Sequence, residues 1–132
     1  MPVKTTVDLC LCGNTLPFKH CCQPLLNGKT TAKTALALMR SRYSAYALSE
    51  ENYLLNTWHS TTRPNNLELQ HSKQQWIRLK IISSSVGQNQ DNVGEVEFIA
   101  TYKSAGKAQH LHERSRFSRE DGEWRYIDGV HD

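Results

Sequence analysis

All four cysteines of this 132-residue chain fall between residues 10 and 22, and the rest of the sequence contains none. They are Cys10, Cys12, Cys21 and Cys22. Four thiolates are the ligand set of a structural zinc site, and the segment between Cys12 and Cys21 is long enough for the chain to fold back and close a tetrahedron. The cluster therefore predicts one bound zinc ion, with all four cysteines as ligands and no position left open for a substrate.

Other uses of these cysteines compete with zinc binding. Disulfide bonds would have to accommodate the adjacent pair Cys21 and Cys22, which is awkward to bridge. Free or redox-active thiols and an iron–sulfur site are further alternatives. His20 directly precedes the two cysteines and is a candidate substitute ligand. For a zinc site, Lys19 and the backbone amides from Gly13 onward are the groups that we expect to offset the surplus negative charge of four thiolates.

The length of the chain is typical of a single domain. We see no secretory signal segment and no apolar run long enough to cross a bilayer, so we expect a cytoplasmic protein without a membrane partner, in which thiols stay reduced. The formal net charge is +3, and four thiolates with one divalent zinc ion would change it to +1 (3 − 4 + 2). Basic side chains outnumber acids within residues 1–49, but no basic run alternates with aromatic residues. The pattern therefore gives nucleic-acid binding little support.

Hydrophobic periodicity predicts helices in the first half of the chain. From Thr31 to Leu48 apolar residues recur every three or four positions, which places them on one face of a helix. Ser49, followed by two glutamates, is predicted to be the N-cap of a second, short helix that extends to Trp58. Before both helices, a turn at Asn27-Gly28-Lys29 marks the boundary between the cysteine segment and the main domain.

After Trp76 the hydrophobic period changes to two. Apolar and polar residues alternate in four runs, with turns predicted at residues 87–92, 103–107 and 121–122. The last two runs place the following residues on one face each: Leu111, Glu113, Ser115 and Phe117, then Trp124, Tyr126 and Asp128. Helices followed by a meander of antiparallel strands predict an α+β domain in which the helices cover one face of the sheet.

Several segments resemble known motifs. Cys10-x-Cys12-Gly13, followed by Cys21-Cys22-x-Pro24, resembles the SEC-C zinc motif, with Asn14 where the motif commonly has Ser. Further segments are similar to the YchJ family, and with the cysteines they span residues 10 to 129. These segments are Leu38-Met39-Arg40-Ser41-Arg42-Tyr43-Ser44-Ala45-Tyr46, Tyr53-Leu54, Thr57-Trp58-His59, Arg63-Pro64, Glu113-Arg114-Ser115-Arg116-Phe117 and Trp124-x-Tyr126-x-Asp128-Gly129.

The resemblance implies a bacterial zinc-binding protein built from two parts. A SEC-C-like knuckle would occupy residues 1–28, and a nuclear-transport-factor-2-like (NTF2-like) α+β domain would occupy residues 29–132. In that domain the helices pack on a curved antiparallel sheet and form a cone with a pocket. The resemblance implies no particular activity. We expect the knuckle to bind a protein partner, and a small ligand in the pocket is a further alternative. We also expect the knuckle to be modular, so that Cys21→Ser loosens residues 1–24 and leaves the main domain folded.

Four residues are candidates for the pocket: Arg42, His59, Arg63 and Glu113. Glu113 shares strand parity with apolar neighbours, so we expect it to point inward, where a carboxylate must be paired or protonated. A salt bridge from Glu113 to an arginine would have a structural role. This alternative favours a non-enzymatic module that binds a partner or a small ligand, which is the function that we prefer. The other alternative is a small-molecule enzyme that uses His59 or Glu113 as its acid or base.

Aromatic and histidine side chains are less informative. Helical or strand spacing assigns most of the aromatic residues to the core rather than to a ligand cage. These residues are Tyr43, Tyr46, Tyr53, Trp58, Trp76, Trp124 and Tyr126. His110 and His112 lie on the strand face opposite to Glu113, and we expect them to be exposed.

Overall fold

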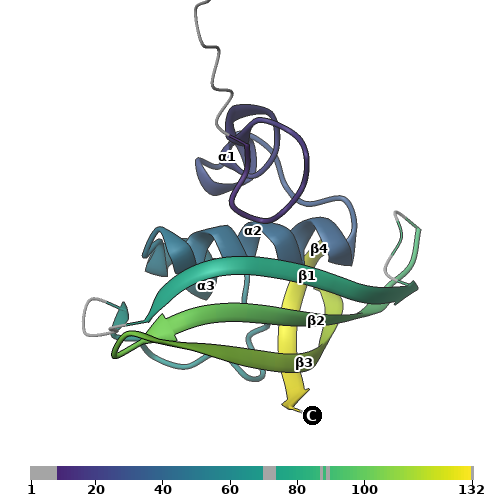
Figure 1. Ribbon diagram of the computed structural model, residues 1–132. Coiled ribbons are helices and arrows are strands. Elements are labelled where there is room, and N and C mark those ends of the chain that lie inside the picture. Colours follow the sequence, from purple (N-terminus) through teal and green to yellow (C-terminus); the bar gives the residue numbers. More distant parts are fainter. Residues whose placement is uncertain (1–8, 70–73, 87, 89, 132) are drawn as a thin grey trace, which may run out of the picture.

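The computed structural model describes residues 9–69, 74–86, 88 and 90–131. A curved sheet covers one side of a helix layer, and the cysteine-containing knuckle lies on the other side of that layer (Figure 1). The elements in chain order are η1 (Phe18–His20), α1 (Gln23–Leu26), α2 (Ala35–Ala47), α3 (Glu51–Asn56), β1 (Gln75–Val86), β2 (Val93–Ser104), β3 (Lys107–Glu120) and β4 (Glu123–His131). This arrangement confirms the predicted α+β class. Within the described residues, no helix has the length and apolarity needed to cross a membrane.

Helix α2 is the central element of the fold. It begins later than the sequence period predicts because Thr34 is extended, with φ −139° and ψ 159°, and its hydroxyl accepts a hydrogen bond from the Ala37 amide. The helix is buried on more than one face, since the sheet covers one side and the knuckle covers the other (Figure 1). Its buried residues are Ala35, Leu38, Met39, Ser41, Arg42, Tyr43, Ser44 and Ala45. The prediction of one apolar face therefore accounts for only part of the buried surface of this helix.

The predicted N-cap of α3 is wrong. Ser49 has φ +59°, which is a left-handed conformation, and Glu50 takes the N-cap position without a side-chain hydrogen bond. At the C-terminal end of α3, a side chain does satisfy a free backbone carbonyl group. One Nη1 atom of Arg42 donates to the Leu54 carbonyl and to the Thr57 hydroxyl, each at 2.7 Å. A cation at a helix C-terminus is favourable because it meets free carbonyl groups and the negative end of the helix dipole.

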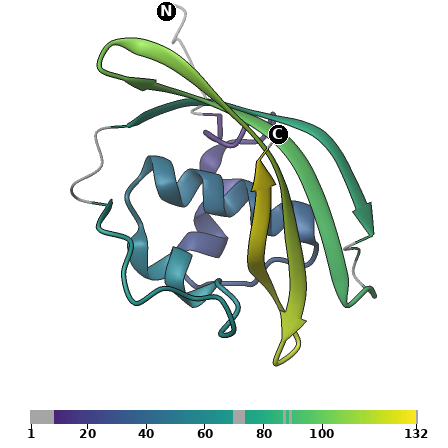
Figure 2. The same cartoon turned by 90° about the horizontal axis from the view of Figure 1, so that it is seen from below.

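The four strands form an antiparallel sheet in the order β1-β2-β3-β4, and Figure 2 shows this sheet curving around the helices. Two-residue turns at Ala105-Gly106 and Asp121-Gly122 connect the last three strands, and all four residues have positive φ between 53° and 82°. Such turns match the right-handed twist of the flanking strands. The predicted turn at residues 87–92 lies partly outside the described residues.

The face of β3 that carries Glu113, Ser115 and Phe117 is buried, as predicted. In β4 the predicted alternation is broken. Register shifts between Arg116, which pairs with Asp128, and Phe117, which pairs with Tyr126. This bulge turns Asp128 to the outer face, where its carboxylate binds Arg116 through two hydrogen bonds of 2.7 Å.

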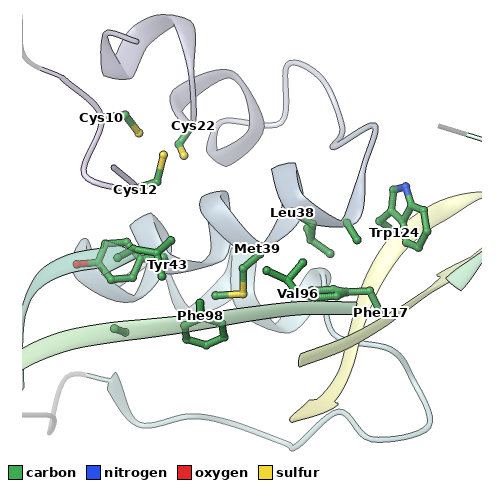
Figure 3. Close-up of a cluster of buried hydrophobic side chains, with 13 residues drawn as sticks. Cys10, Cys12, Cys22, Leu38, Met39, Tyr43, Val96, Phe98, Phe117 and Trp124 are labelled. Carbon is green, nitrogen blue, oxygen red and sulfur yellow. The ribbon is translucent and has the colours of Figure 1, made fainter. Parts of the chain in front are cut away.

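One hydrophobic core joins the knuckle, the helix layer and the sheet. Figure 3 shows Cys12 and Cys22 above α2, and Leu38, Met39 and Phe98 on the sheet side. The same cluster extends to Phe117 and Trp124, and the Trp124 indole donates to the Lys33 carbonyl at 3.2 Å. The cysteines are therefore part of the packed interior and do not project from it.

Candidate functional site

The four cysteine sulfurs form a compact group. All four Sγ atoms lie within 4.8 Å of one another, and those of Cys12 and Cys21 are 3.6 Å apart. None of the four cysteines forms a disulfide bond. Zinc–sulfur bonds of about 2.3 Å in a tetrahedron place sulfur atoms about 3.8 Å apart. The sulfurs of Cys10, Cys12 and Cys22 point toward one another in Figure 3, so the donor set fits a four-thiolate metal site.

A tight turn brings the first two cysteines into the site. Cys10 donates its amide to the Leu16 carbonyl at 2.9 Å, and Gly13 closes the turn with φ +86°. A Cβ atom at Gly13 would lie 2.9 Å from the Leu79 carbonyl oxygen of β1. Two features therefore require a glycine at position 13: the left-handed backbone conformation and the close approach of the knuckle to the sheet.

The second pair reaches the site because the backbone bends between two short helices. The Cys21 amide donates to the Phe18 carbonyl at 3.0 Å, and Cys21 has φ −121° and ψ −93°. Cys22 is the N-cap residue of α1. Adjacent cysteines can therefore both direct their sulfurs to one point. His20 is exposed and lies outside the group of ligand atoms found among the described residues.

Polar side chains from outside the cysteine pairs contact the sulfurs. Arg40 on α2 donates to the Cys12 carbonyl at 2.8 Å and approaches the Cys12 sulfur at 3.9 Å. Asn14 Nδ2 donates to the Cys21 sulfur at 3.7 Å. Lys19, which we expected to offset the thiolate charge, is exposed. Sequence reasoning missed Arg40 because it lies 28 positions after Cys12, and no local pattern predicts a contact between residues so far apart in the chain.

The same helix supplies a contact to the first cysteine. Ser44 Oγ lies 3.7 Å from the Cys10 sulfur, one helical turn after Arg40. Residues 40 and 44 thus form a polar strip on the face of α2 that meets the knuckle. The group of four cysteines is held by contacts from both α2 and the cysteine turns, and in metal sites such outer contacts orient the ligands.

The thiols differ in their tendency to ionise. Hydrogen bonds from Cys12, and then from Cys22, lower the pKa of Cys10 far below its ordinary value. The pKa of Cys22 is raised, first because its hydrogen bond to Cys10 favours the protonated form. Burial raises the pKa of Cys21 to about 12. Four thiolates in this volume would need a cation to compensate their charge, and a divalent metal ion would supply it.

A second feature is a cavity of about 500 Å³ between α2 and the concave face of the sheet. Its apolar wall is largely aromatic, and its polar groups are gathered from α2, β3 and β4. The lining residues are Met39, Arg42, Tyr43, Tyr46, Gln74, Trp76, Phe98, Ala100, Tyr102, Leu111, Glu113, Ser115, Tyr126 and His131. Four of the aromatic residues that spacing assigned to the core, Tyr43, Tyr46, Trp76 and Tyr126, thus form part of a cavity wall.

Glu113 is the carboxylate of this cavity. It is 7% exposed, and its Oε2 accepts hydrogen bonds from the Ser115 hydroxyl at 2.6 Å and the Tyr126 hydroxyl at 3.4 Å. Its Oε1 lies 3.3 Å from Nε2 of His131. Glu113 thus points inward as predicted, and its observed partners are two hydroxyls and a histidine in place of the expected arginines. Of these partners, the sequence analysis had considered Tyr126 only as a core residue.

Arg42 is a buried cation at the same cavity. Its Cζ lies 5.0 Å from the ring centroid of Trp58 and 4.6 Å from that of Tyr126, which is cation–π geometry. Burial lowers the pKa of Arg42, while the nearby phenol of Tyr46 acts in the opposite direction. The guanidinium nevertheless stays charged, because its ordinary pKa is so high.

His59 and Arg63 are not among the described residues that line this cavity. The Nδ1 atom of His59 accepts from the Thr61 amide at 3.2 Å, and the Arg63 guanidinium donates to the Trp58 carbonyl. Both side chains therefore stabilise the loop after α3. Of the four pocket candidates, the structure brings only Arg42 and Glu113 together at the cavity.

Comparison with known proteins agrees with this architecture. Residues 34–129 match the family described as YchJ, middle NTF2-like domain. A UPF0225 protein of Chromobacterium violaceum is 47% identical over 123 residues, which cover 92% of this chain and 91% of the relative. The solution structure of a SEC-C motif-containing protein from Rhodopseudomonas palustris superposes with a TM-score of 0.82 at 33% identity, covering 92% of this chain and 97% of that one. A crystal structure of a SEC-C motif-containing protein from Psychrobacter arcticus, at 24% identity and a TM-score of 0.77, shares the fold, covering 96% of this chain and 84% of that one.

Proposed function

The chain belongs to the YchJ family of NTF2-like proteins, and on that premise we propose that it is a zinc-binding, non-enzymatic module whose cone domain binds a small ligand. The observation that carries the proposal is the group of four free cysteine sulfurs within 4.8 Å of one another, packed on the helix that also lines the cavity. We place this function in the cytoplasm, where thiols remain available for a metal.

Zinc is the metal that this donor set favours. Four thiolates form a closed tetrahedral shell, so the ion would serve structure and would not activate a substrate. Three of the cysteines are at most 5% exposed, namely Cys10, Cys12 and Cys22, and such burial suits a permanent structural ion. When bound, zinc would fasten the two cysteine turns to each other and hold the knuckle against Arg40 and Ser44.

Metal content tests this part of the proposal directly. The protein is purified without added metal and without a metal-binding tag, and elemental mass spectrometry is combined with a count of reactive thiols before and after chelation. We expect one zinc ion per chain and four thiols that become reactive only after chelation. Reduced protein that holds no metal and takes up no added zinc would refute the assignment.

The exposed side of the knuckle is where we propose a protein partner. Leu9, Leu11 and Leu16 are 55%, 48% and 46% exposed, although they are large apolar side chains. Lys19 and His20, also exposed, lie in the same short segment. Exposed apolar groups with basic neighbours suit a protein surface better than a nucleic-acid backbone, which would demand more cationic groups.

Acid–base chemistry by Glu113 is the second candidate function. A buried carboxylate beside an apolar cavity and a tyrosine hydroxyl at 3.4 Å is an arrangement that could transfer a proton. The test compares the native protein with Glu113→Gln during incubation with a bacterial metabolite extract, followed by mass spectrometry. Consumption of one compound by the native protein alone would favour an enzyme, and unchanged compounds with retained ligand binding would favour the non-enzymatic module.

A further inference from the structure

The cavity concentrates aromatic rings around one carboxylate. The indole of Trp76 lies at the centre of the ring contacts, with centroid distances of 5.9 Å to Tyr43, 6.1 Å to Tyr46 and 5.1 Å to Tyr102. All four rings line the cavity together with Phe98 and Tyr126. The face of an aromatic ring carries partial negative charge and attracts organic cations.

The Glu113 carboxylate lines the same cavity as this aromatic wall. Both hydroxyl partners of Glu113 donate to Oε2, whereas Oε1 faces the His131 imidazole, whose side chain is 66% exposed. Because the imidazole is largely exposed, a ligand donor can take its place without displacing a packed side chain. Oε1 is thus the atom of the cavity that a ligand donor can reach.

Arg42, the other ion at the cavity, is turned away from this position. It donates to the Leu54 carbonyl and the Thr57 hydroxyl, and its guanidinium is stacked on the rings of Trp58 and Tyr126. Both ions are buried, with Arg42 3% exposed and Glu113 7% exposed. The Tyr126 side chain contacts Arg42 through its ring and Glu113 through its hydroxyl, so it separates the two charges.

From these contacts we infer that the cavity binds an organic amine, with its ammonium group on Oε1 of Glu113 and its apolar body against Trp76, Tyr102 and Phe98. A carboxylate supplies the charge-assisted hydrogen bond, and the rings supply both apolar surface and attraction for the cation. A cavity of about 500 Å³ is in the size range of small-molecule sites. The inference rests on the proposed ligand-binding function and specifies its ligand class.

Three probes with one apolar body and different head groups test the ligand class. They are 2-phenylethylamine, 2-phenylethanol and 3-phenylpropionate, which present a cation, a neutral hydroxyl and an anion. Each is titrated into the zinc-loaded full-length protein and followed by backbone amide NMR shifts. We expect the amine to bind about tenfold more tightly than the alcohol, and the propionate to bind most weakly, because one charge-assisted contact separates them.

Two variants locate the effect. Glu113→Gln keeps the side-chain shape and removes the charge, so the preference for the amine over the alcohol should vanish while alcohol binding persists. Glu97→Gln is the matched control, because Glu97 is a carboxylate of the same sheet whose Oε2 binds His112 at 2.7 Å and which does not line the cavity. This variant should retain the preference for the amine.

The outcomes separate the inference from the function on which it rests. Equal or tighter binding of the alcohol or the propionate, with shifts at cavity residues, would overturn the amine assignment and leave ligand binding intact. Failure of all three probes to bind at millimolar concentration would overturn both. Amine-induced shifts confined to residues outside the cavity would refute the site. The native comparison of three probes decides the ligand class even if Glu113→Gln does not fold.

Discussion

Glu113 on β3 lies against Gly129 on β4, so closely that a Cβ atom at Gly129 would overlap the Glu113 carboxyl group. The two residues are diagonal neighbours, because Gly129 pairs with Ser115 and Glu113 pairs with His131. Gly129 thus leaves the space that the inward-facing carboxylate occupies. The reason for this glycine is steric, since its side-chain position is filled by another residue.

Gly129→Ala should therefore displace the Glu113 carboxylate and destabilise the protein. We expect a loss of about 1–3 kcal/mol in the free energy of unfolding, the usual cost of inserting a methyl group into packed surroundings. Urea denaturation measures the change. In a Glu113→Ala background the same Gly129→Ala substitution should cost much less, because the overlapping group is gone. An equal cost in both backgrounds would contradict the steric explanation.

Arg40→Met should weaken zinc binding without unfolding the main domain. Arg40 donates to the Cys12 carbonyl and approaches its sulfur, so its removal leaves the thiolate charge less compensated. We expect zinc affinity to fall by about 10- to 100-fold, as for other outer contacts of metal ligands, measured by competition with a chromogenic chelator. Lys19→Gln is the control, since Lys19 is exposed and should not change the affinity. Equal effects of the two variants would point to general electrostatics.

Removal of the metal should lower the thermal stability of the main domain. Cys12 and Cys22 are 0% and 1% exposed and belong to the same core cluster as Leu38 and Tyr43. A metal ion that binds only the folded state stabilises every part of the protein that unfolds together with the knuckle. Chelation should therefore shift the main unfolding transition to lower temperature. Differential scanning calorimetry measures this shift, and Cys21→Ser should reproduce it. An unchanged main transition would instead support the fully modular knuckle expected from the sequence.

Alkaline pH should destabilise the fold through its buried tyrosines. Burial raises the pKa of Tyr43 to about 12, and burial also raises those of Tyr46, Tyr53 and Tyr126. The unfolded chain then releases its phenolic protons first, at about pH 10, so this stabilisation is complete below that pH and is lost as pH rises toward the folded-state pKa values.

The denaturation midpoint, followed from neutral into alkaline solution, checks this prediction. It should fall once the pH exceeds about 10. Tyr43→Phe is the matched comparison, since it retains the buried ring and removes one ionising group, and the fall should be shallower. A midpoint that stays constant until all tyrosines have ionised would show that the phenols are not coupled to folding.

Local patterns explain which parts of the structure could be predicted. Strand period gave the inward position of Glu113, because successive side chains alternate across a strand whatever the rest of the fold does. Asp121-Gly122 identified its own turn, since both residues tolerate positive φ. The prediction that Asp128 shares a strand face with Trp124 and Tyr126 was wrong, because the bulge in β4 depends on pairing with β3 and cannot be seen in the hydrophobic period.

The set of four cysteines and the order of helices and strands could be read from the sequence, because cysteine clustering and hydrophobic period are properties of neighbouring residues. What surrounds each site depends instead on tertiary packing. Arg40 meets Cys12, and Tyr126 stands between Arg42 and Glu113, because segments far apart in the chain pack on the two faces of α2. Such contacts follow from the packing of the whole chain, and no local propensity encodes them.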